Sequence, residues 1–377
     1  MVRSFFLLLV SLSGFVARSA VAQVQYTLTP VGTLGGATSY AAGINASGQV
    51  VGRAQTIGST FHAFLYSDGA LQDLGTLGGS DSEASGINSR GQIAGWSSTG
   101  AGNIHAYVYS GGTMNDLGTL AGGSASYGSG INASGQVVGY SLVNGSSGFH
   151  AFLDSNGSMS DIGTLGGSYA YATGISDSGQ IVGYSDALVA SDAFLYSNGA
   201  MRALGNLGGN MTQANSINNN GQVVGYSYVS LNAYDAFLYT NGNMQDLGTL
   251  GGLLSGANAI NNLSQIVGWA ATTGNTSHAF LYEGGAMLDL NNLIAPGSGW
   301  TIDDAYAIND KGWIAATGTN TNVNGGAEQA LLLTPEPASL IILGLGVVAL
   351  LTKRKPARMQ AVDGLERRSG SAARPTR

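Results

Sequence analysis

Residues 171–185 read Tyr-Ala-Thr-Gly-Ile-Ser-Asp-Ser-Gly-Gln-Ile-Val-Gly-Tyr-Ser, and near-copies of this stretch recur along the 377-residue chain. The isoleucine of the Gly-Ile-Asn core, or of its close variants, stands at Ile44, Ile87, Ile131, Ile175, Ile217, Ile260 and Ile308, with spacings of 42 to 48 residues. Periods of this size are typical of arrays, solenoids and propellers, because each copy is one supersecondary unit that stacks on the next. The repeat therefore decides the architecture.

Each repeat contains four short segments that are typical of β-strands. Examples, in order, are 42–45 (Ala-Gly-Ile-Asn), 136–139 (Gln-Val-Val-Gly), 63–66 (Ala-Phe-Leu-Tyr) and 244–247 (Met-Gln-Asp-Leu). The β-branched and aromatic residues suit a pleated surface. A linker of the form Gly-Thr-Leu-Gly-Gly follows the fourth segment. It lacks the Gly-Lys-Ser/Thr end of a phosphate-binding loop, so we interpret it as a turn between repeats.

A two-residue turn separates the third and fourth segments in six successive repeats. The pairs are Asp68-Gly69, Gly111-Gly112, Asn156-Gly157, Asn198-Gly199, Asn241-Gly242 and Gly284-Gly285. Type I′ turns need positive φ at both central positions, which Gly, Asn and Asp tolerate. The sequence therefore predicts tight antiparallel hairpins here.

The ends of the repeat region complement each other. Residues 26–34 copy a fourth segment without its predecessors, and the last repeat stops at its third segment, 330–333. Joining the two would complete a seventh sheet and leave no open edge, whereas an open solenoid would leave one. Consecutive apolar residues such as Val137 and Val138 also indicate sheets covered on both faces. The sequence predicts an all-β, seven-bladed β-propeller of four-stranded blades, closed by the N-terminal strand, with Gly-Ile-Asn on the innermost strand.

The first 22 residues have the features of a secretory signal peptide. Arg3 precedes the apolar run 5–16, and residues 20–22 (Ala-Val-Ala) offer a small-residue cleavage site. An uncleaved anchor is the alternative, but the run is short for a membrane span. We therefore assign residues 1–22 to a signal peptide and 23–334 to the propeller.

A second apolar stretch, 338–351, lies near the C-terminus. It is preceded by Pro335, Glu336 and Pro337 and followed by Lys353, Arg354, Lys355 and Arg358. As a helix it would be about 21 Å long at ~1.5 Å per residue, less than the ~30 Å hydrocarbon core. It can insert if the basic side chains snorkel to the cytoplasmic side. The sequence predicts a short C-terminal transmembrane helix within 335–358 and a basic, disordered tail at 359–377.

These three parts together resemble the PEP-CTERM sorting domain of exported proteins in Gram-negative bacteria that make extracellular polysaccharide. The resemblance implies that an exosortase, a membrane protease-transpeptidase, recognises Pro335, Glu336 and Pro337, and that Lys353, Arg354, Lys355 and Arg358 form the basic stop. The tail 359–377 departs from the family, whose members usually end soon after the basic cluster. An ordinary tail anchor is the alternative.

The repeats resemble the HAF family of extracellular repeats, named for a His-Ala-Phe sequence. That sequence stands here at 62–64, 150–152 and 278–280, and the resemblance covers about 26–333. It implies an extracellular location and a repeat architecture, and it brings no known reaction.

The charge of the predicted propeller is strongly negative. Its cations are Arg53, Arg90, Arg202 and Lys311, against 18 acidic residues, so it carries 4 minus 18, or −14. Nucleic acid binds mainly through cations, so we expect no nucleic-acid partner. The chain has no cysteine, which excludes disulfides and thiolate chemistry.

All four histidines occupy one position of the repeat. They are His62, His105, His150 and His278, and the same position holds Asp192, Asp235 and Gln329 in other repeats. A position that accepts these residue types predicts a structural hydrogen bond to a neighbouring turn or blade; a metal-binding ring is the alternative. Neither His-Glu-x-x-His nor Gly-x-Ser-x-Gly occurs, and we expect no catalytic residue, cofactor or metal site.

Aromatic residues are the candidate glycan contacts. One follows the second segment in five successive repeats, at Trp96, Tyr140, Tyr184, Tyr226 and Trp269. Flat rings with polar tips can stack on the apolar faces of sugars, although packing between blades is the alternative. Trp300 is a sixth candidate, in a linker that departs from the repeat. Asp303 and Asp304 follow it as the acids outside the repeat template, and neighbouring strand residues would point to opposite faces.

The sequence thus predicts an exported protein at the cell surface or in the extracellular matrix, anchored in the membrane at least transiently. We interpret it as a non-catalytic binding or structural module of the polysaccharide matrix. An exosortase and the membrane would be its partners during sorting, and extracellular polysaccharide its ligand. A propeller-type polysaccharide lyase or glycosidase is the alternative, and it would need paired carboxylates across the ring.

Overall fold

The computed structural model describes residues 24–143, 145, 148–186 and 191–337. The expected signal peptide (1–22), the apolar stretch 338–351, the basic residues 353–358 and the tail 359–377 lie outside the described residues. Among the residues that are described, no helix has the length and apolar character needed to cross a membrane. The chain divides into two compact parts, 1–336 and 337–377, and the fold below is that of the first.

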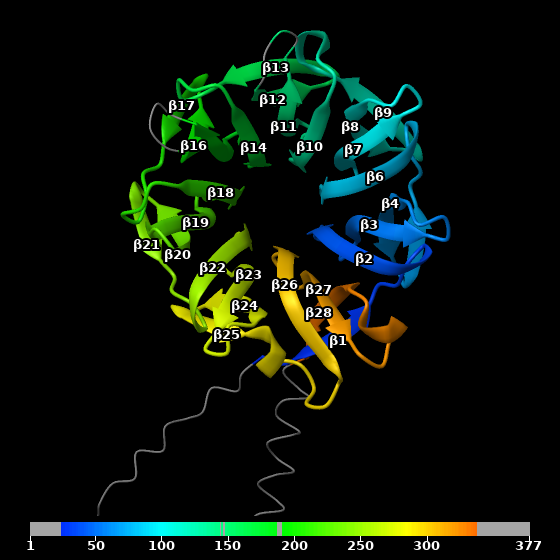
Figure 1. Ribbon diagram of the computed structural model, residues 1–377, viewed down its shortest axis with the longest axis vertical. Coiled ribbons are helices and arrows are strands. Elements are labelled where there is room, and N and C mark those ends of the chain that lie inside the picture. Colours follow the sequence, from blue (N-terminus) through cyan, green and yellow to red (C-terminus); the bar gives the residue numbers. More distant parts are fainter. Residues whose placement is uncertain (1–23, 144, 146–147, 187–190, 338–377) are drawn as a thin grey trace, which may run out of the picture. The chain divides into compact units, whose positions relative to one another are not determined.

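The first part is an all-β ring of antiparallel sheets (Figure 1), and its inner strands line a central channel. Its strands fall into repeat units that run from the channel outwards. The first four units are β2–β5 (Gly35–Ile44, Val50–Thr56, Phe61–Ser67, Ala70–Asp73), β6–β9 (Gly78–Ile87, Ile93–Thr99, Ile104–Ser110, Thr113–Gly118), β10–β13 (Ser126–Ile131, Val137–Leu142, Phe149–Ser155, Ser158–Gly163) and β14–β17 (Ala170–Ile175, Ile181–Asp186, Ser191–Ser197, Ala200–Ala203). The fifth and sixth are β18–β21 (Thr212–Ile217, Val223–Ser230, Ala233–Thr240, Asn243–Asp246) and β22–β25 (Gly251–Ile260, Ile266–Thr272, Ser277–Glu283, Ala286–Asp289). The last unit combines β26–β28 (Trp300–Ile308, Ile314–Asn320, Gln329–Pro335) with β1 (Tyr26–Pro30). Short 3₁₀ helices cover Leu120–Gly122, Leu290–Asn292 and Asn324–Gly326.

Hydrogen bonding groups the described strands into five four-stranded sheets and one eight-stranded sheet. The eight-stranded sheet contains the fifth and sixth units, joined by a single parallel pair between Tyr234 of β20 and Leu254 of β22. The prediction of separate four-stranded sheets is therefore met in five cases. It fails where the start of β22 runs beside β20.

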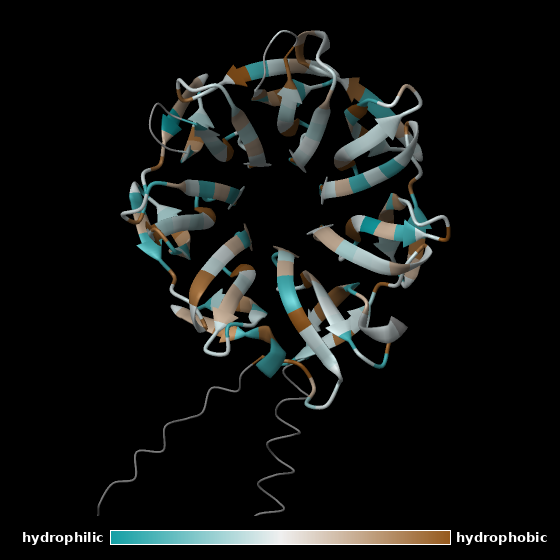
Figure 2. Ribbon diagram, viewed as in Figure 1, coloured by the Kyte–Doolittle hydropathy of each residue, from teal (hydrophilic) through white to brown (hydrophobic). Residues whose placement is uncertain are grey.

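The apolar core lies between neighbouring sheets, and apolar residues recur in every part of the ring (Figure 2). Val50 and Val51 are adjacent in β3, and neither is exposed to solvent. Val50 packs in one cluster with Ala315 of the last unit, and Val51 in another with Ile93 of the second. Both faces of the sheet are therefore covered, as the consecutive apolar residues predict.

The glycine of the Val-Val-Gly segment allows the first two strands to approach closely. Gly139 of β11 pairs with Gly128 of β10, and a Cβ at Gly139 would collide with the carbonyl oxygen of Tyr127. The predicted hairpins are also present, because both turn residues have positive φ in all six pairs, for example 52° at Asp68 and 80° at Gly69.

The N-terminal strand closes the ring, as predicted. β1 pairs antiparallel with β28, with Leu28 opposite Leu333 and Thr29 opposite Leu332. Val31 then donates its backbone N–H to the carbonyl oxygen of Ala330 (2.9 Å). Tyr26 and Leu333 are both buried in one cluster with residues of the preceding linker. The two ends of the repeat region thus share one sheet.

In six of the seven units, an asparagine directly after the inner strand ties its unit to the next. Asn45 Nδ2 donates to the carbonyl oxygen of Asn88 (3.3 Å), and its Oδ1 accepts the backbone N–H groups of Ser47 and Gln49. The other links run from Asn88 to Asn132, Asn132 to Ser176, Asn218 to Asn261, Asn261 to Asn309 and Asn309 to Asn45, at 2.9–3.2 Å. The motif therefore makes both the turn and the contact between units.

Ser176 replaces asparagine in the fourth unit and cannot span the distance to the fifth. Its side chain is buried and accepts the backbone N–H of Gln180 instead. We expect Ser176→Asn to add the missing link to Asn218 and to stabilise the fold by about 1 kcal/mol. The melting temperature should rise by roughly 1–2 °C, whereas Asn132→Ser, which removes an existing link, should lower it. An unchanged or lower melting temperature for Ser176→Asn would contradict this account of the ring.

Candidate functional site: an aromatic belt beside a polar channel

The inner strands line a central channel with a cavity of about 380 Å³. Its wall includes Gly43-Ile44-Asn45 and, apart from Ser176, the equivalent residues of the other units, which confirms the predicted innermost position. Polar wall side chains mostly link neighbouring units. Asn215 Nδ2 donates to the carbonyl oxygen of Ala257 (2.8 Å), and Asn219 Nδ2 to Asp177 Oδ2 (2.7 Å). The polar groups of the channel wall therefore have a structural role, because their hydrogen bonds connect neighbouring units.

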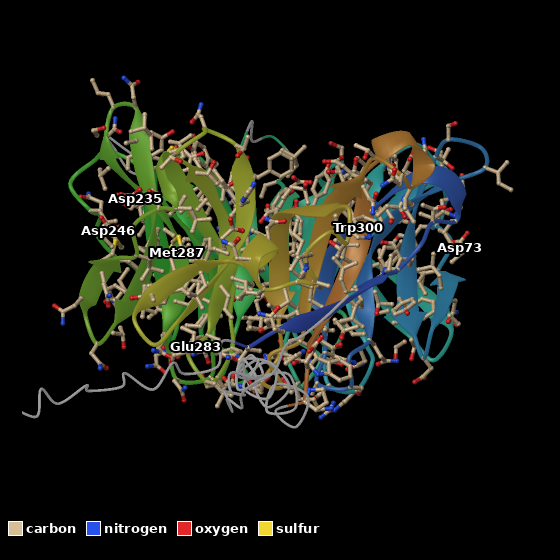
Figure 3. All side chains as sticks on the ribbon, turned by 90° about the horizontal axis from the view of Figure 1, so that it is seen from below. Asp73, Asp235, Asp246, Glu283, Met287 and Trp300 are labelled. Atoms are coloured by element: carbon tan, nitrogen blue, oxygen red, sulfur yellow. The ribbon has the colours of Figure 1, made fainter. Side chains whose placement is uncertain are left out.

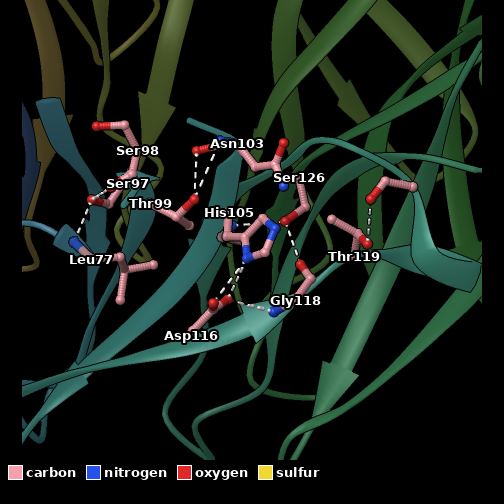
Figure 4. Close-up of polar contacts among 12 residues, drawn as sticks. Leu77, Ser97, Ser98, Thr99, Asn103, His105, Asp116, Gly118, Thr119 and Ser126 are labelled. Atoms are coloured by element: carbon pink, nitrogen blue, oxygen red, sulfur yellow. Dashed lines mark hydrogen bonds and ion pairs between the residues drawn. The ribbon is translucent and has the colours of Figure 1, made fainter. Parts of the chain in front are cut away.

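Each histidine faces an aspartate on the next strand of its own unit. His105 Nδ1 lies 2.8 Å from a carboxylate oxygen of Asp116, which also accepts the backbone N–H of Gly118 (2.7 Å; Figure 4). The equivalent pairs are His62–Asp73, His150–Asp161 and His278–Asp289, at 2.7–2.9 Å. The predicted structural hydrogen bond is therefore present in these four units, but its partner lies on the next strand of the same unit and not in a neighbouring turn or blade. In the described part of the chain, no three His, Asp or Glu residues are grouped to hold a metal.

The fifth unit replaces the histidine of this pair with an acid. Asp235 faces Asp246, and the two side chains lie near one another in Figure 3. Burial, together with the charge of Asp246, raises the pKa of Asp235 to about 6. Two carboxyl groups in contact favour sharing a proton, so this pair is the acidic counterpart of the His–Asp pairs.

The predicted aromatic positions belong to a larger group of rings. We define the aromatic belt as the connected rings of the second, third and fourth units: Trp96, Tyr127, Tyr140, Phe149, Tyr169, Tyr171 and Tyr184. Successive centroids are 5.8 Å apart for Trp96–Tyr127, 4.9 Å for Tyr127–Tyr140, 4.7 Å for Tyr140–Tyr171 and 4.9 Å for Tyr171–Tyr184. Two of these contacts cross from one unit to the next.

A smaller group of rings lies in the fifth and sixth units. Tyr234 contacts Tyr226 (5.0 Å), Tyr228 (5.2 Å) and Trp269 (5.9 Å). The five repeated positions therefore all take part in ring contacts. Trp96, Tyr140 and Trp269 contact a ring of a neighbouring unit, whereas Tyr184 and Tyr226 contact rings of their own unit. This packing does not exclude a binding surface, because every ring in both groups is half-buried.

The rings differ in how deeply they sit. Tyr140 stacks on Tyr127 and meets Phe149 and Tyr171 at an angle, and burial raises its pKa well above the ordinary range. Burial likewise raises the pKa of Tyr184 to about 12. For Tyr127 and Tyr171, on the inner strands, burial raises the pKa less. Among these four tyrosines, Tyr140 and Tyr184 on the second strands are thus the more deeply buried, and Tyr127 and Tyr171 on the inner strands lie nearer solvent.

Sequence reasoning missed the rings of the inner strands. Strand register places Tyr127 opposite Tyr140 and Tyr171 opposite Tyr184. The signal was available, since both residues occupy the same position before Gly-Ile-Asn/Ser in their repeats. It is weaker than the second-strand signal because other units hold Glu83, Gln213 and Gly256 at this position.

Trp300 and the two following acids lie in the last unit, apart from the belt. Trp300 begins β26 and packs against the cluster that contains Leu290 and Leu293. A β-bulge at Asp303 shifts the register from Ile302 opposite Gly318 to Asp304 opposite Thr317. The expectation that the two acids point to opposite faces assumed regular alternation, which the bulge removes.

The acids of the last unit are partly buried among hydrogen-bonding groups. Burial raises the pKa of Asp304 to about 7, although Asn258 Nδ2 donates to its Oδ1 (2.7 Å). Burial and the charge of Glu328 raise the pKa of Asp303 to about 6. Tyr40 donates its hydroxyl to Glu328 Oε2 (2.6 Å). This side of the ring is therefore acidic.

Arg53 lies between the acidic side and the aromatic belt. It forms an ion pair with Glu83 (3.0 Å) and lies over the rings of Tyr40 (5.0 Å) and Phe61 (5.2 Å). Its charge is therefore already engaged by one carboxylate and two rings.

The predicted sorting motif begins inside the closing sheet. Pro335 is the last residue of β28 and lies opposite Tyr26. Glu336 then donates its backbone N–H to the carbonyl oxygen of Gln25 (2.7 Å). The segment that follows the predicted signal peptide thus contacts the start of the sorting motif.

Comparison with protein families identifies this C-terminal signal. The profile of the PEP-CTERM protein-sorting motif matches residues 333–355. The match confirms the expected sorting signal and supports an exported, membrane-sorted protein. No curated protein matches the sequence at a significant level.

The solved structures that are similar to this chain have low sequence identity to it. TolB from Acinetobacter baumannii is 14% identical over 76% of this chain and 79% of its own, with a TM-score of 0.41. A gluconolactonase from Xanthomonas campestris is 10% identical over 83% and 95%, with a TM-score of 0.38. The Aleuria aurantia lectin in complex with Fucα1-6GlcNAc is 13% identical over 71% and 100%, with a TM-score of 0.37.

Proposed function

We propose that this chain is a cell-surface module that binds extracellular polysaccharide without catalysis, after an exosortase has sorted it at the membrane. We interpret its ring as a seven-bladed propeller, counting the eight-stranded sheet as two blades, and its repeats as members of the HAF family. The observation that carries the proposal is the aromatic belt.

The belt has the chemistry expected of a sugar-binding surface. Its seven rings are half-buried and connected across three units. Contiguous apolar patches on a protein surface mark interaction sites. Tyrosine adds a polar tip to an apolar ring, so one side chain can stack on a sugar face and also bond a hydroxyl. The underlying rings fix the outer rings in place, which limits the entropy lost on binding.

A polysaccharide lyase or glycosidase remains the second candidate. The raised pKa values of Asp303 and Asp304 favour it, because perturbed carboxyl groups gather at catalytic sites. Against it, the carboxylate of Asp304 is engaged by Asn258 in the channel wall. Turnover of a polysaccharide that Asp303→Asn abolishes would establish this alternative.

Binding to polysaccharide tests the proposal directly. We expect the exported protein to be retained on the producer's own matrix polysaccharide and on a subset of a glycan array. Tyr171→Ala should weaken retention by about tenfold, the effect of losing ~1.4 kcal/mol of stacking. Ile57→Ala removes an exposed apolar side chain outside the belt, so this control should bind like the wild type. Uniform absence of binding would leave only a structural role.

A further inference from the structure

The belt is one continuous row of rings and does not divide into one site per unit. It crosses from the second to the third unit at Trp96–Tyr127 and from the third to the fourth at Tyr140–Tyr171. Between these crossings, Tyr127 and Tyr140 are stacked, with ring planes 21° apart. A ligand that uses the whole row must therefore be longer than a single sugar.

From this continuity we infer that the belt binds an extended, uncharged polysaccharide chain that lies along the row across the unit boundaries. The inference rests on the proposed function and specifies its ligand. Tyr127 and Tyr171, near solvent, provide two of the stacking platforms, and Phe149 contacts both rings, at 6.0 and 5.7 Å. Successive sugars of one chain would contact successive rings.

The charges beside the belt disfavour an acidic chain. Glu83 lies next to Trp96 in the paired strands β6 and β7, and Arg53 already neutralises it. Asp186 accepts backbone N–H groups from Ser168 and Tyr169 (both 2.8 Å), the second of which belongs to the belt. Uronic-acid carboxylates would find no free cation among these neighbours. They would also meet the field of a domain with a net charge of −14, from 4 cations and 18 acids.

Oligomers of increasing length distinguish this ligand from a single sugar. The full-length protein would be titrated on immobilised neutral polysaccharides (β-glucan and mannan) and acidic ones (polygalacturonate and alginate). The affinity of the protein for oligomers of the neutral polysaccharide that binds most tightly would then be measured by calorimetry. We expect binding of the neutral class, with affinity rising about tenfold or more from the monosaccharide to the longest oligomer. Tyr127→Ala and Tyr171→Ala should each abolish that rise.

Matched variants keep the result interpretable. Tyr127→Phe retains the ring and should retain the increase of affinity with oligomer length. Tyr127→Leu retains an apolar side chain without a flat ring and should lose this increase. The leucine variant replaces Tyr127→Ala if the alanine variant fails to fold. Tyr234→Ala, in the separate group of rings, should leave the length dependence intact. Equal affinity for monosaccharide and oligomer, or preference for the acidic polymers, would overturn the inference while the proposed function stands. No binding to any polysaccharide would overturn both.

Discussion

Deletion of residues 24–30, which contain β1, is expected to lower the melting temperature of the ring by about 10 °C. The deletion exposes the apolar partners of Tyr26 and Leu28 and removes the ladder between β1 and β28. Each buried side chain contributes roughly 1.5–3 kcal/mol and each ladder bond about 1 kcal/mol. At an unfolding entropy of ~2.1 cal/mol/K per residue, 1 kcal/mol corresponds to roughly 1.5 °C in a domain of about 310 residues. Calorimetry would measure the shift.

The same deletion should make the protein self-associate. Without β1, strand β28 becomes an open edge with unpaired backbone groups, which invites pairing with a second chain. Size-exclusion chromatography would detect the larger species. Thr27→Pro and Thr27→Val form the matched pair, because the side chain of Thr27 is exposed. Thr27 stands four residues before Val31, whose backbone N–H bonds to β28, so the N–H of Thr27 points to the same strand and proline would remove it. Equal stability of the proline and valine variants, with a monomeric deletion protein, would contradict closure by this strand.

The closure could be predicted because it depends on what each end of the repeat lacks. A fourth segment stands at residues 26–34 and a third segment at 330–333, and counting segments is enough to pair them. The turn pairs are equally local, since positive φ at Asp68 and Gly69 follows from residue type. The ring closure and the hairpin turns could therefore be predicted from the sequence, because they depend on the order of the segments and on the residue types of the turns.

The contacts between units could not be read in the same way. The Gly-Ile-Asn motif predicts the end of a strand, but the hydrogen bond from Asn45 to the carbonyl oxygen of Asn88 depends on how two units pack against each other. The belt depends on register, since Tyr127 joins it only because it lies opposite Tyr140. The joining of two units at Tyr234 and Leu254 also has no signal in the repeat.

The bulge at Asp303 shows a different limit of sequence reasoning. Alternation in a strand predicts opposite faces for neighbouring residues, and one extra residue changes that rule. In β26 the buried residues Ile302, Ala305 and Ile308 are three apart, because a second register shift lies between Ala305 and Ala307. Such shifts place Asp303 and Asp304 in partly buried positions that a regular strand would not give them.

Asp304→Asn is expected to make the ring more stable at pH 8 by up to about 4 kcal/mol. Burial raises the pKa of Asp304 from 3.8 to about 7, and each pKa unit corresponds to ~1.4 kcal/mol. Because the folded pKa is above the unfolded value, folding favours the protonated acid. Its contribution to stability is fully present below about pH 4 and is lost as the pH rises through about 7. Asparagine cannot ionise, and its carbonyl oxygen can still accept from Asn258.

Chemical denaturation at pH 4, 6 and 8 would measure this dependence, with Asp81→Asn as a control of opposite sign. Asp81 accepts the backbone N–H of Phe61 (3.0 Å), and this bond, together with one from Ser80, lowers the pKa of its carboxyl group. Its contribution is therefore present above the unfolded pKa and is lost as the pH falls, so Asp81→Asn should destabilise the ring at pH 8 and matter least in acid. If Asp304→Asn did not raise the free energy of unfolding at pH 8, ionisation of Asp304 in the folded protein would cost little. The pKa of Asp304 would then not be raised, and the catalytic alternative would lose this support.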